Sequence, residues 1–278
     1  MNNPVSARHD LEFFDTHCHF DFGEFDDDRD ALWEECRRRG IRQMLIPGVQ
    51  PDQWPRMQTL CAQHPGIYYA AGLHPCWLDD NIDNSKRDTQ LSYLHQALRS
   101  QLDDPYCIAV GECGLDQYID GDAKLQEAVL ACHLEIAQEF NKPIILHCRR
   151  AHNQLVRCLK AYPLKRGGIL HAYSGSLEQA EQYWQMGFYL GIGGTITYER
   201  ANKTRNAVKG LPLAALVLET DAPDMPLCGQ QGQRNTPLSI REVARTLALL
   251  RGETIETISQ QTTHNAKTLF QLNDLRVA

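Results

Sequence analysis

Two histidines stand near the start of the chain with a single cysteine between them, in the stretch FFDTHCHF. Side chains two positions apart in a strand point to the same face, so His17 and His19 face one way and Cys18 faces the other. The same alternation separates His147 from Cys148. This geometry disfavours a Cys/His catalytic pair, and we expect both cysteines to pack between strands and helices. A metal site is the interpretation that the rest of the chain must support.

Further ionisable residues stand at the ends of other short apolar runs, namely His74, Glu112, His147, His171 and Asp221. Taken alone, each has an ordinary structural explanation, such as a hydrogen-bonded histidine, a salt-bridging carboxylate or a helix cap. If they converge, their burial would be costly without a positive partner, and a divalent metal is the simplest one. Four imidazoles and two carboxylates exceed the ligands of one catalytic zinc, so two ions that share Glu112 fit the count better.

The elements that must position these residues alternate along the whole chain. Short β-rich runs are nearly continuously apolar at their start, as expected of parallel strands that are covered on both faces. Stretches with apolar residues at helical spacing lie between them. The predicted strands cover residues 11–20, 41–48, 67–75, 107–116, 143–149, 167–175, 188–195 and 216–223, and the predicted helices cover about 31–39, 54–63, 92–102, 123–141, 153–162, 177–186 and 240–250.

Eight such βα units in sequence, with no composition break, predict an α/β fold that is a single (β/α)8 TIM barrel rather than a doubly wound open sheet. The length of 278 residues fits one barrel domain over residues 1–278, of which 1–11 are expected to be an N-terminal extension. The active site of a barrel lies at the C-terminal ends of its strands, where the histidines and carboxylates above are found. Residues far apart in the sequence are therefore expected to meet at one rim.

Composition limits the function further. The formal net charge of −7 argues against the broad polybasic surface of a protein that coats nucleic acid, although it allows a small anionic substrate. We find no apolar run that could span a bilayer and no signal-peptide pattern, so we expect a cytoplasmic protein that does not bind membranes. The 10 cysteines, without a CxxC pair, are expected to be reduced. No obligate protein partner is evident, and we expect a monomer.

The motifs DTHCHFD, GLHP, GECGLD, ILHCRRA, HAYSGS, LETDAP and RNTP occur in the order typical of one family. The chain resembles the TatD-type metal-dependent hydrolases of the amidohydrolase superfamily, and within them the branch typified by the bacterial YjjV proteins. The resemblance implies a hydrolase in which His74 and Arg149 contact substrate phosphate. It also implies the ligands of two metals, one held by His17, His19, Glu112 and Asp221 and the other by Glu112, His147 and His171.

The leading hypothesis is a two-metal phosphoesterase, most simply a deoxyribonuclease of TatD type that uses a metal-bridging hydroxide. Its catalytic residues would be Asp221, Glu112, His74 and Arg149, with Asp221 orienting the water and accepting its proton. The ions would be zinc, manganese, magnesium, cobalt or nickel, and the partner a phosphate-containing substrate such as DNA or a nucleotide. We expect Arg150 to point into the helix layer.

Two other functions remain open on the sequence alone. An amidohydrolase or lactonase that cleaves a C–N or C–O bond would use much the same ligands, and a barrel that binds metal without catalysis is the non-enzymatic alternative. The rim departs from characterised DNases of the family, because Gln117 and Tyr118 replace an aromatic pair and Asp224 replaces a tyrosine. Minor expectations are that Trp77 stacks on a base, that Lys203, Arg205 and Arg234 are solvated, and that His133 lies at the surface or core edge.

Overall fold

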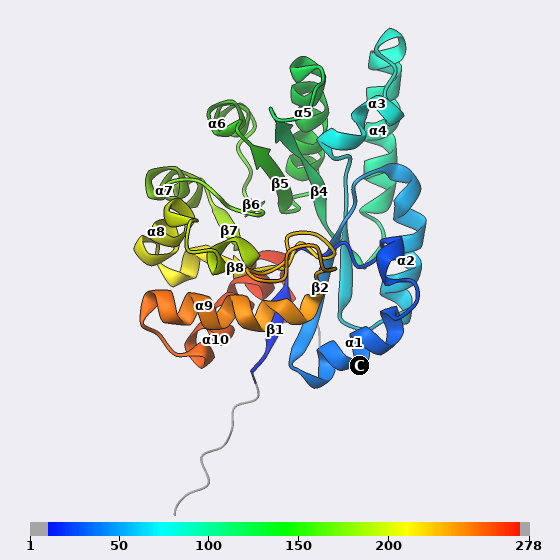
Figure 1. Ribbon diagram of the computed structural model, residues 1–278. Helices are drawn as coiled ribbons and strands as arrows, with labels where there is room; N and C mark the ends of the chain where they lie inside the picture. The colour runs from blue at the N-terminus through cyan, green and yellow to red at the C-terminus, as the bar shows by residue number, and fades with distance from the viewer. Residues whose placement is uncertain (1–10, 273–278) are drawn as a thin grey trace, which may run out of the picture.

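The computed structural model describes residues 11–272, so the expected N-terminal extension lies outside them except for Leu11. The strands form one parallel sheet in which β1 to β8 follow each other in chain order (Figure 1). This confirms the predicted (β/α)8 barrel, while the single-domain organisation of residues 1–278 stays a prediction. The strands are β1 (Phe13–Asp15), β2 (Ile41–Pro47), β3 (Ile67–Ala71), β4 (Cys107–Asp116), β5 (Ile144–Arg149), β6 (Gly168–Leu170), β7 (Phe188–Ile192) and β8 (Leu216–Leu218).

Polar contacts join the first strand of the barrel to the last. The backbone N–H of Thr16 donates to the carbonyl of Leu218 at 3.0 Å. The fully buried carboxylate of Asp15 accepts from the backbone N–H and the hydroxyl of Thr220, at 3.0 and 2.6 Å. Burial raises the pKa of Asp15 to about 7 despite these hydrogen bonds. A polar seam between β1 and β8 therefore lies directly beneath the first histidine pair.

Helices surround the barrel, and the structure adds several that the sequence patterns did not predict (Figure 1). The predicted helices agree with the observed ones to within a few residues at most ends. The unpredicted α8 and α10 are rich in Asn, Thr, Gln and Lys, which weakens the apolar stripe on which the prediction depended. The helices are α1 (Arg29–Arg38), α2 (Trp54–Gln63), α3 (Leu78–Asn81), α4 (Arg87–Gln101), α5 (Ala123–Glu139), α6 (His152–Ala161), α7 (Leu177–Gln185), α8 (Asn202–Gly210), α9 (Ile240–Arg251) and α10 (Ile255–Phe270).

The apolar core has two parts. The larger part fills the space between the sheet and the helices, and Cys18 is packed there as predicted. The smaller part fills the barrel interior with one side chain from most strands, including Leu45, Ile145 and Val217, and α10 completes it. Phe270 of α10 packs on Phe14 of β1 with ring centroids 5.5 Å apart. The interior is thus closed by apolar contacts below the polar rim.

None of the described helices is long and apolar enough to cross a membrane.

Several strands end earlier than predicted. The segments at 11–20, 167–175 and 216–223 were predicted as strands throughout, but β1, β6 and β8 end at Asp15, Leu170 and Leu218. Left-handed backbone at Ala172 (φ 45°) and Asp221 (φ 56°) interrupts the extended conformation. The candidate ligands His17, His19, His171 and Asp221 consequently lie in the segments that follow these strands.

Candidate metal centre

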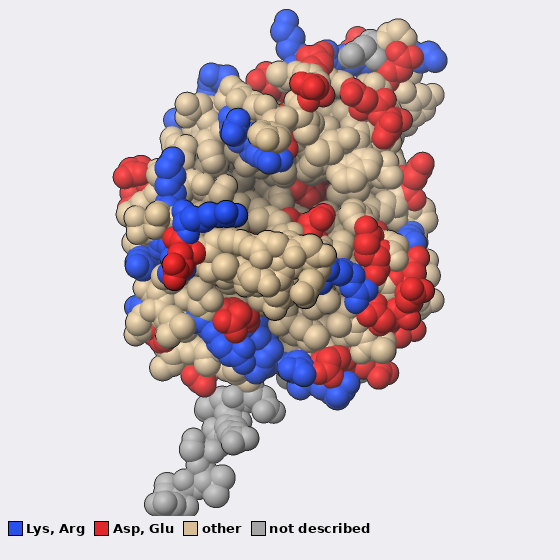
Figure 2. Space-filling model, in the orientation of Figure 1, with Lys and Arg blue, Asp and Glu red and all other residues tan. Residues whose placement is uncertain are grey.

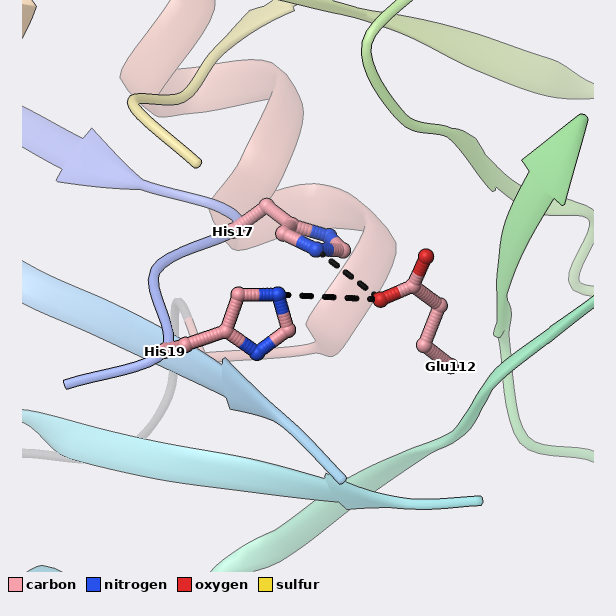
Figure 3. A group of neighbouring side chains, drawn as sticks. All are labelled: His17, His19 and Glu112. Carbon is pink, nitrogen blue, oxygen red and sulfur yellow. Dashed lines mark ion pairs between the residues drawn. The ribbon is translucent and has the colours of Figure 1, made fainter. Parts of the chain in front are cut away.

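A buried carboxylate, Glu112 of β4, lies at the centre of the carboxyl-terminal end of the barrel and is only 2% exposed. One of its oxygens, Oε2, lies 3.1 Å from Nε2 of His17 and 3.9 Å from Nε2 of His19. Both rings reach toward this oxygen from the segment after β1 (Figure 3). Oδ1 of Asp221 lies 3.4 and 3.5 Å from the same two ring nitrogens. We call this group of three residues around Oε2 the Oε2 side.

The other oxygen of Glu112, Oε1, faces a second set of imidazoles. Nε2 of His171 lies 2.8 Å away and Nδ1 of His147 lies 3.2 Å away. The two ring nitrogens are themselves 3.1 Å apart. His74 approaches the same oxygen with Nε2 at 3.4 Å. We call the group formed by His74, His147 and His171 the Oε1 side.

The other five predicted metal ligands and His74 are therefore brought together around the carboxylate of Glu112, from five different strands or the segments that follow them. They converge because the barrel topology places every strand end at the same rim, and their role as metal ligands stays a prediction. Arg149 is exposed at the end of β5, where its guanidinium carbon lies 4.0 Å from the centroid of the Tyr118 ring. Trp77 contacts His74 edge to face, with centroids 5.3 Å apart.

Among the predictions about basic side chains, the one for Arg150 was wrong, whereas Arg234 is exposed as expected and Arg205 is half-buried. Arg150 is exposed and lies over the Tyr118 ring, because its left-handed backbone (φ 56°) turns it away from the helix layer. Arg234 is engaged by both carboxylate oxygens of Asp28, at 2.9 and 2.6 Å, and so ties the loop after β8 to the loop after β1. Arg205 donates to the carbonyl of Ile196 at 2.8 Å.

An outer carboxylate, Asp116, orients His147, and the sequence prediction missed it. Its Oδ2 lies 3.0 Å from Nε2 of His147, so that nitrogen donates and Nδ1 is left to face Glu112. Burial works to raise the pKa of Asp116, but the hydrogen bonds from His147 and from the backbone of Tyr118 outweigh it and the pKa is lowered. The side chain of Gln126 in turn holds both the N–H and the carbonyl of Asp116. The motif GECGLD contained this residue, but nothing in its spacing distinguished it from a loop aspartate.

A second outer carboxylate, Glu219, lies beneath His171 and was also missed. One of its oxygens accepts from the backbone N–H of Ala172 at 2.5 Å and lies 4.0 Å from Nδ1 of His171. Burial raises the pKa of Glu219 to about 8. A Cβ at Gly191 would lie 2.1 Å from the other oxygen, so glycine is required there to make room for the carboxyl group.

The hydrogen bonds of His74 give it a different role from the other imidazoles. Its Nδ1 accepts from the backbone N–H of Cys76 at 3.1 Å. The neutral ring therefore carries its proton on Nε2, the atom that faces Glu112. A protonated nitrogen donates a hydrogen bond and cannot ligate a metal. This favours the predicted substrate contact over a ligand role.

His133 was expected at the surface or core edge, and this prediction was wrong because the ring is fully buried. Its Nε2 accepts from the backbone N–H of Leu73 at 3.0 Å, and Nδ1 donates to the carbonyl of Val129 at 2.7 Å. Burial lowers the pKa of His133 to about 4. The ring thus links α5 to the backbone immediately before His74.

The electrostatics of the centre favour positive charge, which a divalent cation would supply in place of the proton on His171. Burial opposes charge on every group, yet the charge of Glu112 raises the pKa of His171 to about 10, and the imidazoles hold the pKa of Glu112 well below its usual range. Burial lowers the pKa of His17 to about 4, which leaves the neutral form that binds metals. Both ring nitrogens of His17 are buried without a hydrogen-bond partner among the described residues. These nitrogen and carboxylate donors fit one or more divalent cations.

Comparison with known proteins agrees with this chemistry. Residues 14–271 match the family model described as TatD related DNase. The chain is 42% identical to the metal-dependent hydrolase YjjV of Escherichia coli K12 over 261 residues, which cover 94% of this chain and 98% of that relative. The chain belongs to the TatD family. It is thus a metal-dependent hydrolase, as the resemblance in the sequence implied.

A solved structure and a more distant relative agree with this family assignment. The crystal structure of E. coli YjjV superposes with a TM-score of 0.87 at 41% identity, covering 94% of this chain and 98% of that one. A more distant relative, at 28% identity over 94% of this chain and 98% of its own length, is the 3′-5′ ssDNA/RNA exonuclease TatD of Klebsiella pneumoniae.

Proposed function

We propose that this chain is a phosphoesterase that hydrolyses phosphodiester bonds of a nucleic acid strand or nucleotide, with two divalent cations sharing Glu112. The observation that carries the proposal is the division of ligand atoms between the two oxygens of that carboxylate, one set facing Oε2 and another facing Oε1. This division is what a carboxylate that bridges two cations requires. The exonuclease activity in the name of the K. pneumoniae TatD relative supports the choice of substrate class.

Each polar residue of the centre has a role in this proposal. Cations bound there would supply Lewis acidity, which makes the attacking water easier to deprotonate and offsets charge on the phosphoryl oxygens. Asp221 orients the water and accepts its proton. Burial works to raise the pKa of Asp221, but His19 and His17 outweigh it and keep the carboxylate ionised. His74 donates a hydrogen bond from Nε2 to a phosphoryl oxygen, and the planar guanidinium of Arg149 binds a phosphate of the substrate.

The test is a substrate panel with the metal-loaded protein. We would compare kcat/KM for a single-stranded oligonucleotide and bis-p-nitrophenyl phosphate with that for p-nitrophenyl phosphate, a lactone and an anilide, in Mg²⁺, Mn²⁺, Co²⁺, Ni²⁺ or Zn²⁺. We expect the phosphodiesters to react fastest and a chelator to abolish the reaction. Faster cleavage of the lactone or anilide would refute the proposal in favour of C–O or C–N hydrolysis.

A matched pair of variants guards against a contaminating nuclease. Arg42→Gln changes an exposed residue near the start of β2, at the end of the barrel opposite the metal centre, and is expected to keep full activity. Glu112→Gln, purified in the same way, is expected to lose it. Equal activity of the two preparations would assign the reaction to a contaminant.

A further inference from the structure

Two arginines share one exposed tyrosine at the rim of the barrel. The guanidinium carbons of Arg149 and Arg150 lie 4.0 and 5.0 Å from the centroid of the Tyr118 ring. The ring is 58% exposed, and both arginines are exposed as well. Acidic side chains lie inside the hollow at the centre of this face, and Lys and Arg side chains lie beside it (Figure 2). We call Arg149, Arg150 and Tyr118 the guanidinium–tyrosine stack.

Backbone contacts fix the stack relative to the metal centre. The N–H of Gln117 donates to the carbonyl of Arg149 at 3.0 Å, which joins the loop after β4 to the end of β5. The N–H of Tyr118 donates to Oδ1 of Asp116 at 2.7 Å. The other oxygen of the same carboxylate lies 3.0 Å from His147. One aspartate therefore holds both the tyrosine of the stack and an imidazole of the Oε1 side.

The stack holds two like charges on one ring without a paired carboxylate among the described residues. Arg150 adopts a left-handed backbone (φ 56°), which is unfavourable by about 1–2 kcal/mol for a residue with a side chain. Neither arginine forms an ion pair with a carboxylate in residues 11–272, although the chain as a whole carries a formal net charge of −7. Tyr118 contributes the face of its ring, on which guanidinium groups rest favourably.

We propose that the guanidinium–tyrosine stack binds a second phosphate of the substrate, next to the phosphate that lies at Glu112. Each planar guanidinium offers parallel N–H donors to a phosphate, and a phosphate would supply the negative charge that neither arginine receives from a carboxylate of the described residues. The inference rests on the proposed function, because the phosphate at the metal centre supplies the first anchor. The substrate class is then a molecule with two phosphates about one nucleotide apart, as in a nucleic acid strand.

Equilibrium binding to the metal-loaded protein tests this without requiring turnover. Isothermal titration with thymidine 3′,5′-bisphosphate would be compared with thymidine 3′-monophosphate and thymidine 5′-monophosphate. We expect the bisphosphate to bind about tenfold more tightly than either monophosphate, as one added charge-assisted contact predicts. A bisphosphate that binds no more tightly than the monophosphates would overturn the proposal.

Variants identify the residues responsible. Arg150→Asn removes the guanidinium while asparagine accepts the left-handed backbone, so the variant should fold and should reduce the bisphosphate advantage to about twofold or less. Tyr118→Leu should weaken it, whereas Tyr118→Phe, which keeps the ring face, should not. Arg42→Gln removes the same charge at the opposite end of the barrel and should leave the advantage unchanged. A tenfold advantage that persists in Arg150→Asn, or is lost equally in Arg42→Gln, contradicts a specific site.

Oligonucleotide hydrolysis, measured on the same preparations, separates this inference from the proposed function. Hydrolysis without an Arg150-dependent bisphosphate advantage would refute the second phosphate site alone. Arg150-dependent binding without hydrolysis of any phosphodiester would refute the proposed function and leave the phosphate site supported.

Discussion

The two sides of Glu112 differ in how firmly their imidazoles are held. On the Oε1 side, His147 donates to Asp116, whereas Nδ1 of His171 lies 4.0 Å from Glu219 and has no hydrogen-bond partner among the described residues. On the Oε2 side, Nδ1 of His17 and Nδ1 of His19 have no hydrogen-bond partner among the described residues. Outer carboxylates fix ring orientation and raise ligand basicity. The comparison indicates that His147 of the Oε1 side is preorganised by an outer carboxylate, whereas the imidazoles of the Oε2 side would depend on a bound cation and on Asp221.

The largest expected effect comes from removing the group that the two sides share. Glu112→Gln keeps the size of the side chain but removes its charge, so both sides should lose affinity for divalent cations. We expect kcat on a phosphodiester to fall by at least about a thousandfold and the metal content to fall on both sides. Elemental analysis and steady-state kinetics measure this, with Glu135→Gln at an exposed position of α5 as the charge-matched control. A Glu112→Gln protein with full metal content would break the comparison at its centre.

The second-largest effect is expected from a change that affects one side of Glu112 and not the other. Asp221→Asn alters only the Oε2 side, where Asp221 lies 3.4 Å from His17. We expect activity to fall by about a hundredfold to a thousandfold while the Oε1 side retains its metal, because Asp116 still orients His147. Titration of the chelated protein with Mn²⁺ reports the number of cations bound. If the whole metal content disappears in this variant, the two sides do not bind independently.

A smaller effect is expected from the outer carboxylate. Asp116→Asn leaves every predicted ligand in place but weakens the hold on the His147 ring. The affinity of the Oε1 side should fall by about 10- to 100-fold, with little change on the Oε2 side. The same Mn²⁺ titration measures it, and Asp120→Asn, an exposed aspartate of the same loop, is the control. An unchanged affinity would remove the physical basis for ranking the two sides.

His133→Gln is expected to have the smallest effect on activity. Its effect on stability should nevertheless be measurable. Burial lowers the pKa of His133 from 6.5 to about 4, so the folded protein favours the neutral ring. The unfolded chain therefore binds this proton more readily than the folded protein does. The contribution of His133 to the free energy of unfolding is fully present above about pH 6.5 and is lost as the pH falls toward 4, by roughly 3 kcal/mol in total. Urea unfolding of the chelated protein from pH 7.5 to pH 4.5 should show a weaker pH dependence in His133→Gln than in the wild type. If the free energy of unfolding changed equally with pH in both proteins, protonation of His133 would not destabilise the fold.

Most of the fold, and the convergence of the candidate ligands, could be predicted from the sequence because both follow from patterns that repeat along the chain. Apolar runs alternating with amphipathic stretches predict the barrel, and the barrel brings His17, Glu112 and Asp221 to one rim whatever their separation. Asp116 and Glu219 were missed because an outer carboxylate is recognised only by the ring it faces. His133 was misplaced because the burial of one helical residue depends on its packing partner, and Arg150 because φ is not encoded in a pattern of residue types.

The seam between β1 and β8 makes the Oε2 side depend on residues from both ends of the barrel. Asp15 and Thr220, which close the seam beneath it, are 205 positions apart. During synthesis, every candidate ligand except Asp221 emerges before β8 does. An unfinished chain that lacks β8 therefore also lacks the carboxylate of the Oε2 side. Asp221 reaches His17 and His19 only when the two ends of the barrel meet.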